Sequence, residues 1–247
     1  MSRKTKRMSA MTERYGIDIS RAQGAIDWDT LAQNADLSFV LIRAAQGTAQ
    51  DTYFARNIKE VQRVGIPFGL YFAASATTAE DVREEAAAAI DCCRLYKPTL
   101  GAWYDMELPR HRALGRDGVT ALLRCWLDAV RGAGQRCGIY TNKAWLDSLI
   151  DQSLLTDCDL WYAAYPSTAR KALTDAPPNN RQRLSYPQAV LWQWSSAGRV
   201  DGIVGNVDLN IMYEDLAPAE PTPEKGYITL AEAKALLQAQ GYAGIVI

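Results

Sequence analysis

The stretch 100-LGAWYDME-107 is the part of the sequence that indicates the fold. Its first half is apolar at successive positions, which is typical of a strand covered on both faces, as in a parallel sheet. A helical pattern follows at residues 117–134. The two segments together predict one strand–helix unit of an α/β protein.

The same unit recurs along the chain. Other short apolar runs rich in strand-forming residues lie at 15–20, 38–45, 67–74, 137–142, 160–165, 190–195 and 207–212. Helical patterns lie between several of them, at 28–35, 57–65, 79–96 and 143–150, whereas 166–187 and 195–206 have the composition of loops. Eight strands in this arrangement predict a closed (β/α)8-type barrel with irregular or missing last helices. An open doubly wound sheet is the alternative, although it usually has fewer strands and no Gly-x-Gly-x-x-Gly follows the first strand here.

Composition limits the classes of function. The chain has 247 residues, of which 48% are hydrophobic, and a formal net charge of −1, so we expect no nucleic-acid partner. No run approaches the roughly 18 apolar residues of a membrane span. Five cysteines and one histidine, His111, have no zinc-ligand spacing, so we expect no zinc site, and we predict no other metal and no cofactor.

The two ends differ in composition from the middle. We expect a disordered lead over 1–13 and the barrel over 14–216. Residues 217–226 hold three prolines in ten positions and are typical of a stiff linker. Residues 227–247 predict a short helical tail, which either docks on the barrel or begins a truncated accessory module.

Two carboxylates stand at the end of the opening stretch. Residues i and i+2 of a strand share a face, so Trp103, Asp105 and Glu107 are expected to point one way. Tyr104 and Met106 are expected to point the other way.

Two further acids lie in strand runs. Asp18 is in the first run and Asp208 in the last. In a closed barrel these two strands are neighbours, and barrel enzymes build their sites at the carboxyl ends of the strands. We therefore expect four acids to converge at one rim: Asp18, Asp105, Glu107 and Asp208. Because clustered carboxylates repel one another, such a cluster indicates a functional site.

Clustered acids bind hard cations or cleave glycosidic bonds. The neighbouring strand segments are rich in Tyr and Trp, whose faces stack on sugar rings and whose polar atoms form hydrogen bonds. This favours a carbohydrate substrate. The candidate substrate-binding residues are Tyr71, Trp103, Tyr140, Trp161, Tyr165, Gln193 and Trp194.

Glycoside hydrolysis needs a neutral carboxylic acid that protonates the leaving oxygen and a negative group near the developing oxocarbenium ion. We assign Glu107 as the general acid. A nearby carboxylate raises the pKa of such an acid, so we expect Glu107 to stay protonated near neutral pH while Asp105 stays ionised.

Several of these segments together resemble one known family. YGIDIS (15–20), WYDMEL (103–108), IYTN (139–142), LWYAAY (160–165) and the run LWQWSSAGRVDGIVGNVDLNIM (191–212) are similar to glycoside hydrolase family 25, the N-acetylmuramidases or lysozymes of bacteria, fungi and phages. The resemblance covers roughly residues 14–215. It departs from the family pattern at 44-AAQG-47 and 71-YFA-73, where the family often has Ala-Thr-Glu-Gly and Tyr-His-Phe.

The resemblance implies a modified β/α barrel that cleaves the β-1,4 bond between N-acetylmuramic acid and N-acetylglucosamine in peptidoglycan, with retention. It implies that Glu107 is the proton donor, that Asp105 assists the substrate N-acetyl group or acts directly, and that Asp18 and Asp208 support the site. Tyr71, Tyr140, Trp161 and Tyr165 would line the sugar groove. A chitinase-like hydrolase and a barrel that binds glycans without cutting them stay as alternatives.

The N-terminus is basic but lacks the apolar run of a secretory signal. We therefore expect synthesis in the cytoplasm, followed by phage-type or unconventional release to the cell wall.

Overall fold

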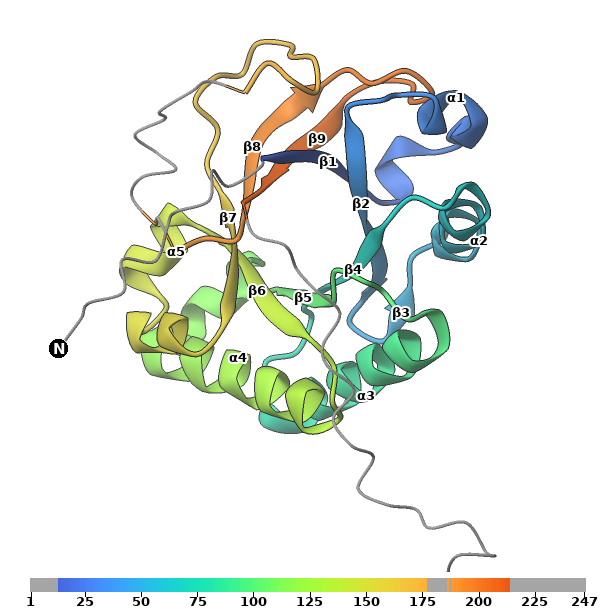
Figure 1. Ribbon diagram of the computed structural model, residues 1–247. Helices are drawn as coiled ribbons and strands as arrows, with labels where there is room; N and C mark the ends of the chain where they lie inside the picture. Colours follow the sequence, from blue (N-terminus) through green and yellow to red (C-terminus); the bar gives the residue numbers. More distant parts are fainter. Residues whose placement is uncertain (1–12, 177–185, 187, 214–247) are drawn as a thin grey trace, which may run out of the picture.

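Short apolar runs form strands that close into a barrel (Figure 1). The structure is a computed structural model and describes residues 13–176, 186 and 188–213. The barrel strands are β1 (Arg14–Ile19), β2 (Leu37–Gln46), β4 (Phe68–Ala73), β5 (Ala102–Asp105), β6 (Cys137–Asn142), β7 (Asp159–Ala163), β8 (Leu191–Gly198) and β9 (Val207–Met212). A two-residue strand, β3 (Ala49–Gln50), pairs with the end of β2. Each of the eight predicted strand runs overlaps one barrel strand, so the predicted barrel is confirmed.

The last strand departs from the regular β/α pattern. All neighbouring barrel strands from β1 to β8 are parallel, but β9 runs antiparallel to both β8 and β1. Asp18 and Asp208 are direct register partners across the β1–β9 pair. Asp208 therefore reaches the rim from the amino end of its strand, which corrects the expectation that all four acids follow carboxyl ends.

Helices cover the outside of the barrel (Figure 1). They are α1 (Trp28–Ala32), α2 (Phe54–Val64), α3 (Ala79–Tyr96), α4 (Gly115–Gly132) and α5 (Lys143–Ser148), with 3-10 turns η1 (Arg21–Gln23), η2 (Pro109–Leu114) and η3 (Gln152–Thr156). No helix lies in the described part of the β7–β8 connection, residues 164–176, or between β8 and β9. The expected loss of the last helices is thus confirmed for these segments.

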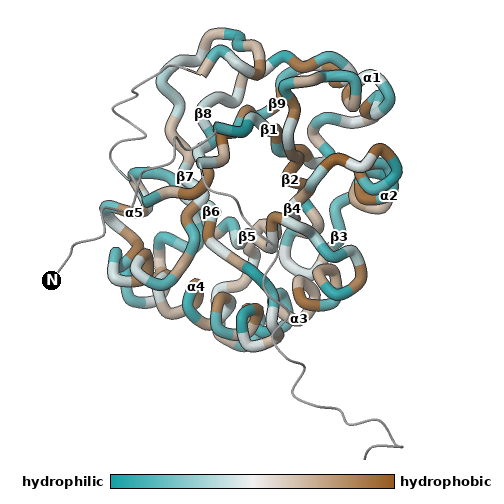
Figure 2. The backbone as a smooth tube through the Cα atoms, in the orientation of Figure 1, coloured by the Kyte–Doolittle hydropathy of each residue, from teal (hydrophilic) through white to brown (hydrophobic). Residues whose placement is uncertain are grey.

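Local sequence explains where the longer helices begin and end. Thr78 caps α3 by accepting a hydrogen bond from the Asp81 N–H, and α2 ends at Gly65, whose φ of 74° is left-handed. The helix α4 buries one stripe, including Leu123, Trp126 and Val130. Figure 2 shows both hydrophilic and hydrophobic residues along the helices, as expected for elements with one buried face.

The sheet separates two buried layers. Tyr104 and Met106 pack with the residues between the strands and the helices, whereas Trp103 packs inside the barrel. The predicted alternation along β5 is therefore confirmed. Gly138 leaves room for the inner layer, because a Cβ atom there would lie 2.5 Å from the Trp103 ring.

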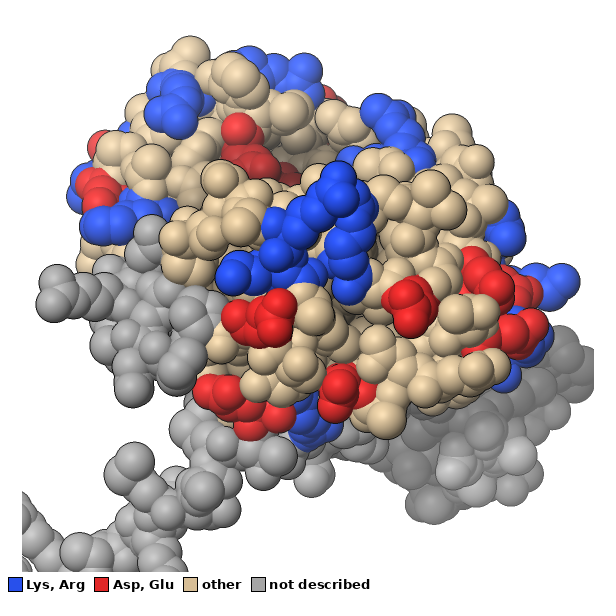
Figure 3. All heavy atoms as spheres, turned by 90° about the horizontal axis from the view of Figure 1, so that it is seen from above, with Lys and Arg blue, Asp and Glu red and all other residues tan. Residues whose placement is uncertain are grey.

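The outer surface carries mixed charge. Figure 3 shows acidic and basic side chains interspersed over one face, with acidic side chains also lying in a hollow. Within the described residues, no helix is long and apolar enough to cross a membrane. The predicted lead, linker and tail at 1–12 and 214–247 lie outside the described residues.

Candidate active site

Strand ends from all around the barrel meet in one pocket of about 210 Å³. Eight of the predicted site residues line it: Asp18, Tyr71, Asp105, Glu107, Tyr140, Trp161, Gln193 and Asp208. Ser20 and Arg43, which were not predicted, line it too. The structure therefore brings together the four acids that lie in separate parts of the sequence.

The acids lie at different depths. Asp18 is buried at 5% exposure, Asp105 and Asp208 are half-buried, and Glu107 is exposed at the mouth of the pocket. This order places Glu107 where a polymeric substrate would first meet the carboxyl groups.

Asp18 is held by two amides. Its Oδ2 atom accepts a hydrogen bond from Gln193 Nε2 at 2.7 Å and from Asn210 Nδ2 at 2.8 Å. Burial raises the pKa of Asp18 to about 6, and the two amide donors oppose this rise because they favour the ionised form.

Asp208 shares a hydrogen bond with Asp18 across the β1–β9 pair. Burial and the neighbouring Asp18 charge raise the pKa of Asp208 to about 8. Of these two coupled carboxyl groups, Asp208 has the higher pKa, so it is the one that takes up the first proton as the pH falls.

Gln193 uses its whole amide within the protein. Besides Asp18, its Nε2 atom contacts Asp208 at 3.4 Å, and its Oε1 atom accepts hydrogen bonds from Tyr140 at 2.8 Å and Tyr165 at 2.6 Å. A glutamine amide has two donor hydrogens and two acceptor sites, so none is left for a substrate. In the free protein Gln193 therefore supports its four neighbours, and its predicted contact with substrate stays a prediction.

Asp105, on the side of the pocket formed by β5, lacks such amide partners in the described part of the chain. Its Oδ1 atom is buried and has no hydrogen-bond partner among the described residues. Burial and the charges of Glu107 and Asp18 raise the pKa of Asp105 well above its ordinary value, and Arg43 opposes this rise. This direction is opposite to the one that favours an ionised Asp105, because burial is the largest cause and Arg43 opposes it only in part.

Glu107 has one amide neighbour. Asn142 Nδ2 donates to Glu107 Oε2 at 3.4 Å. Partial burial raises the pKa of Glu107, and the Asn142 donor lowers it. The predicted direction of the shift is found, but its main cause is burial rather than a neighbouring carboxylate.

Arg43 is the cation that lines the pocket. It comes from β2, where its register partner is Tyr71 on β4. Asp51 fixes the guanidinium through Nε at 2.8 Å and Nη2 at 2.7 Å. A charged residue within the apolar run 38–45 was the sequence signal that could have identified it.

Not all the predicted aromatic residues face the pocket. Trp194 lies on the outward face of β8, buried with the layer between sheet and helices, because the inward positions of this strand are Gln193 and its alternate neighbours. Trp103 is buried in the barrel interior below the pocket and donates to the Leu100 carbonyl. Neither residue lines the pocket with the four acids, so their substrate contact stays a prediction that this pocket does not support.

Three aromatic residues support the pocket from its walls and floor. Trp161 donates to Asn210 Oδ1 at 2.8 Å and packs edge-on against the rings of Tyr71 and Tyr140. Burial raises the pKa of both tyrosines well above 10, so they keep their hydroxyl hydrogens. Tyr165 lies at the rim at 39% exposure and is the aromatic residue most open to a ligand.

The described residues contain no group of three or more His, Cys, Asp or Glu side chains arranged to hold a metal ion. Asp18 and Glu107 instead accept hydrogen bonds from amides, and Asp208 shares a hydrogen bond with Asp18.

A β/α barrel with carboxyl groups gathered at one mouth has the acidic side chains that glycoside hydrolysis uses. The comparison with family models identifies the family: glycosyl hydrolases family 25 matches residues 17–203, and the chain belongs to it.

Similar proteins agree with this assignment. The chain is 24% identical to lysozyme M1 of Streptomyces globisporus, over 79% of this chain and 66% of that protein. It is 27% identical to the uncharacterized protein YegX of Escherichia coli O157:H7, over 80% of this chain and 68% of that protein.

Solved structures share the fold. The modular autolysin LytC of Streptococcus pneumoniae matches at a TM-score of 0.67 and 25% identity, covering 81% of this chain and 47% of that one. The catalytic domain of endolysin ply40 from bacteriophage P40 of Listeria monocytogenes matches at a TM-score of 0.65 and 25% identity, covering 84% and 97%. The match therefore spans about half of LytC and nearly all of the endolysin catalytic domain.

Proposed function

We propose that this glycoside hydrolase cleaves the β-1,4 bond between N-acetylmuramic acid and N-acetylglucosamine in peptidoglycan. The observation that carries the proposal is the position of Glu107 at the mouth of a pocket that holds three further carboxyl groups. Membership of family 25 and the likeness to a lysozyme support it. LytC, which the chain resembles, has been solved with a synthetic peptidoglycan ligand.

Glu107 is the proposed general acid. A carboxyl group can protonate a leaving oxygen only while it holds a proton, and partial burial raises the pKa of Glu107 in that direction. Its exposed position lets a glycosidic oxygen of a long glycan strand approach it.

Asp105 is the proposed partner in the chemistry. Its buried Oδ1 atom has no partner among the described residues, although buried polar atoms are normally hydrogen-bonded. A substrate that enters the pocket can supply the missing group. The N–H of an N-acetyl substituent would make Asp105 an assistant of substrate attack, whereas contact with the anomeric carbon would make it the nucleophile.

Either role gives retention of configuration. In both cases a group on one face of the sugar displaces the leaving oxygen that Glu107 protonates, and water then replaces that group with Glu107 acting as base. The first product would therefore be the β-anomer, which an NMR spectrum recorded before mutarotation would show.

Mass analysis of digested peptidoglycan tests the proposed bond. Fragments are reduced with borohydride, so that each new reducing end becomes a sugar alcohol. We expect the alcohol of N-acetylmuramic acid from the wild type and at least about 100-fold slower release from Glu107→Gln. Alcohols of N-acetylglucosamine, or cleavage of chitin in preference to peptidoglycan, would contradict the proposal.

A further inference from the structure

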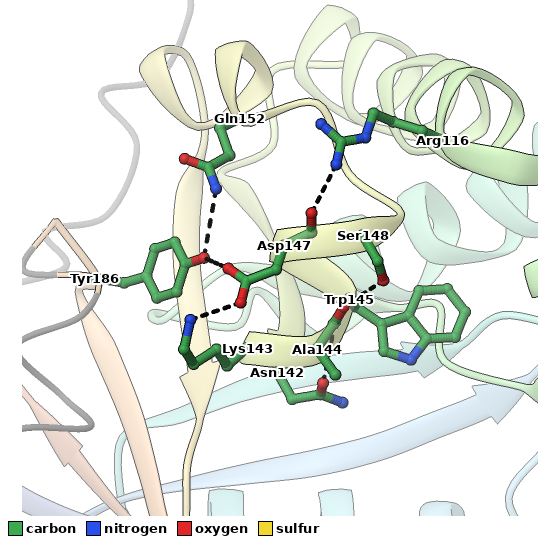
Figure 4. A network of polar contacts seen from close by, with 9 residues as sticks. All are labelled: Arg116, Asn142, Lys143, Ala144, Trp145, Asp147, Ser148, Gln152 and Tyr186. Carbon is green, nitrogen blue, oxygen red and sulfur yellow. Dashed lines mark hydrogen bonds and ion pairs between the residues drawn. The ribbon is translucent and has the colours of Figure 1, made fainter.

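Asn142 links Glu107 to a helix outside the pocket. It ends β6 and caps α5: its Oδ1 atom accepts from the Trp145 N–H at 3.3 Å, while its Nδ2 atom donates to Glu107. Because a backbone N–H can only bond the amide oxygen, the cap fixes which end of the amide faces Glu107. Figure 4 shows Asn142 at the start of α5, next to Trp145.

The helix α5 is itself anchored at several points (Figure 4). The Asp147 carboxylate accepts from Lys143 and from the Tyr186 hydroxyl, each at 2.6 Å, and the Asp147 carbonyl accepts from Arg116 of α4 at 2.6 Å. These contacts tie α5 to α4 and to residue 186. The amide of Asn142 is therefore carried by a fixed element, although it stands at the end of a strand.

The other groups that face Glu107 do not stabilise its charge. The titratable groups on which the Glu107 charge acts are Asp105 of β5 itself and, from other parts of the barrel, Asp18, Asp208, Tyr140 and Tyr165. The carboxylates among them repel an ionised Glu107, and the two phenols donate to Gln193 instead. In the described part of the chain, the Asn142 amide is the side-chain donor that contacts Glu107.

We propose that Asn142 is a positioning residue, whose amide is oriented by the cap of α5, holds the Glu107 carboxyl at the mouth of the pocket and stabilises its ionised form. The distance of 3.4 Å is long for a hydrogen bond, and such bonds in unbound sites often shorten when substrate binds. The consequence for catalysis rests on the proposed function, but the effect on the Glu107 carboxyl does not.

Asn142→Ser separates the two roles of this side chain. Serine is a good N-cap, so it keeps the bond to the start of α5, but its short hydroxyl cannot also donate to Glu107. A donor to the charged form lowers a pKa, so its loss raises the pKa of Glu107, by roughly half to one unit. The measurement is a carbon-13 NMR titration of the glutamate carboxyl groups, with the Glu107 signal identified by its absence in Glu107→Gln.

Two further variants complete the test. Asn142→Asp also keeps the cap but places a negative charge beside Glu107, so we expect a larger rise of its pKa. Asn34→Ser is the matched control, because Asn34 accepts from Asp36 N–H before the amino end of β2, at the opposite end of the barrel. It should leave the Glu107 titration unchanged.

Activity provides a second readout. If the wild-type enzyme releases reducing ends, kcat/KM falls at alkaline pH as Glu107 loses its proton. In Asn142→Ser this fall should move to higher pH by the same amount as the Glu107 pKa in the NMR titration. If Asn142 served folding alone, the variant would have a lower melting temperature, but neither the Glu107 pKa nor the pH profile of kcat/KM would change. A folded Asn142→Ser or Asn142→Asp with an unchanged Glu107 pKa would overturn the proposal. If the titration shifts while wild type cleaves no glycan, the proposed function fails and the positioning role stands.

Discussion

The two walls of the pocket are built in opposite ways. On the wall formed by β1, β8 and β9, Asp18, Gln193 and Asn210 satisfy one another with short hydrogen bonds. On the β5 wall, Asp105 keeps a buried oxygen without a partner among the described residues, and Glu107 is exposed with one long contact. The first wall is complete in the free protein and fixes the geometry, whereas the second leaves bonding capacity for a substrate.

The largest effect expected from this contrast, apart from loss of Glu107 itself, is that of Asp105→Asn. This variant keeps the shape of the side chain and one acceptor oxygen but removes the negative charge and the carboxylate nucleophile, so kcat/KM for peptidoglycan should fall roughly 100-fold. A carboxyl group whose pKa is raised on folding makes the folded state lose stability as pH rises, and the asparagine amide does not ionise, so the free energy of unfolding at pH 7 should not decrease. A loss of less than threefold would show that the unpartnered oxygen has no part in catalysis.

Gln193→Met tests the complete wall. Methionine has a similar length but leaves Asp18 and the hydroxyls of Tyr140 and Tyr165 without their shared partner. The free energy of unfolding, measured with urea, should fall by about 2–4 kcal/mol. The matched control Gln152→Met removes one long 3.5 Å contact from an exposed side chain to Tyr186 and should cost less than about 0.5 kcal/mol. Equal losses would contradict the distinction between the walls.

The pH dependence of stability sharpens the same point. In the folded protein the pKa of Asp208 is about 8, against an ordinary value of 3.8. A raised carboxyl pKa makes the folded state lose stability as pH rises from about 4 to about 8, because the unfolded state ionises first. Asparagine does not ionise, so Asp208→Asn does not lose stability in this way. The free energy of unfolding of Asp208→Asn minus that of wild type should therefore increase between pH 4 and pH 8. If this difference stayed constant with pH, the raised pKa of Asp208 would be contradicted.

The smallest effect is expected outside both walls. Trp194 packs on the outer face of β8, so Trp194→Phe should change kcat/KM by less than about twofold while lowering the free energy of unfolding by about 1–2 kcal/mol. Tyr165→Phe at the rim is the comparison, and it should change KM more than Trp194→Phe does. The reverse order would mean that the outer face of β8 takes part in binding.

Much of the barrel follows from sequence because its signals are local. Successive apolar residues mark the strands, and Gly65 and Thr78 mark helix ends. Closure of the barrel then makes Asp18 and Asp208 neighbours, even though they lie far apart in the chain.

The missed features depend on long-range partners. Gln193 and Asn210 donate hydrogen bonds to Asp18, from which they are separated by 175 and 192 positions in the sequence. No local sequence pattern therefore shows that the hydrogen-bonding groups of these amides are already occupied. Alternation along a strand predicts which residues share a face but not which face is inside, which is how Trp194 was misplaced. The antiparallel direction of β9 likewise depends on how the sheet closes.

The proposed role of Glu107 is the central claim, and the release of new reducing ends from purified peptidoglycan tests it most directly. Wild type and Glu107→Gln are compared at equal concentrations of folded protein. The proton-donor role predicts a loss of at least about 100-fold in rate for the variant, with an unchanged melting temperature because Glu107 is exposed. Equal rates from the two proteins would contradict it.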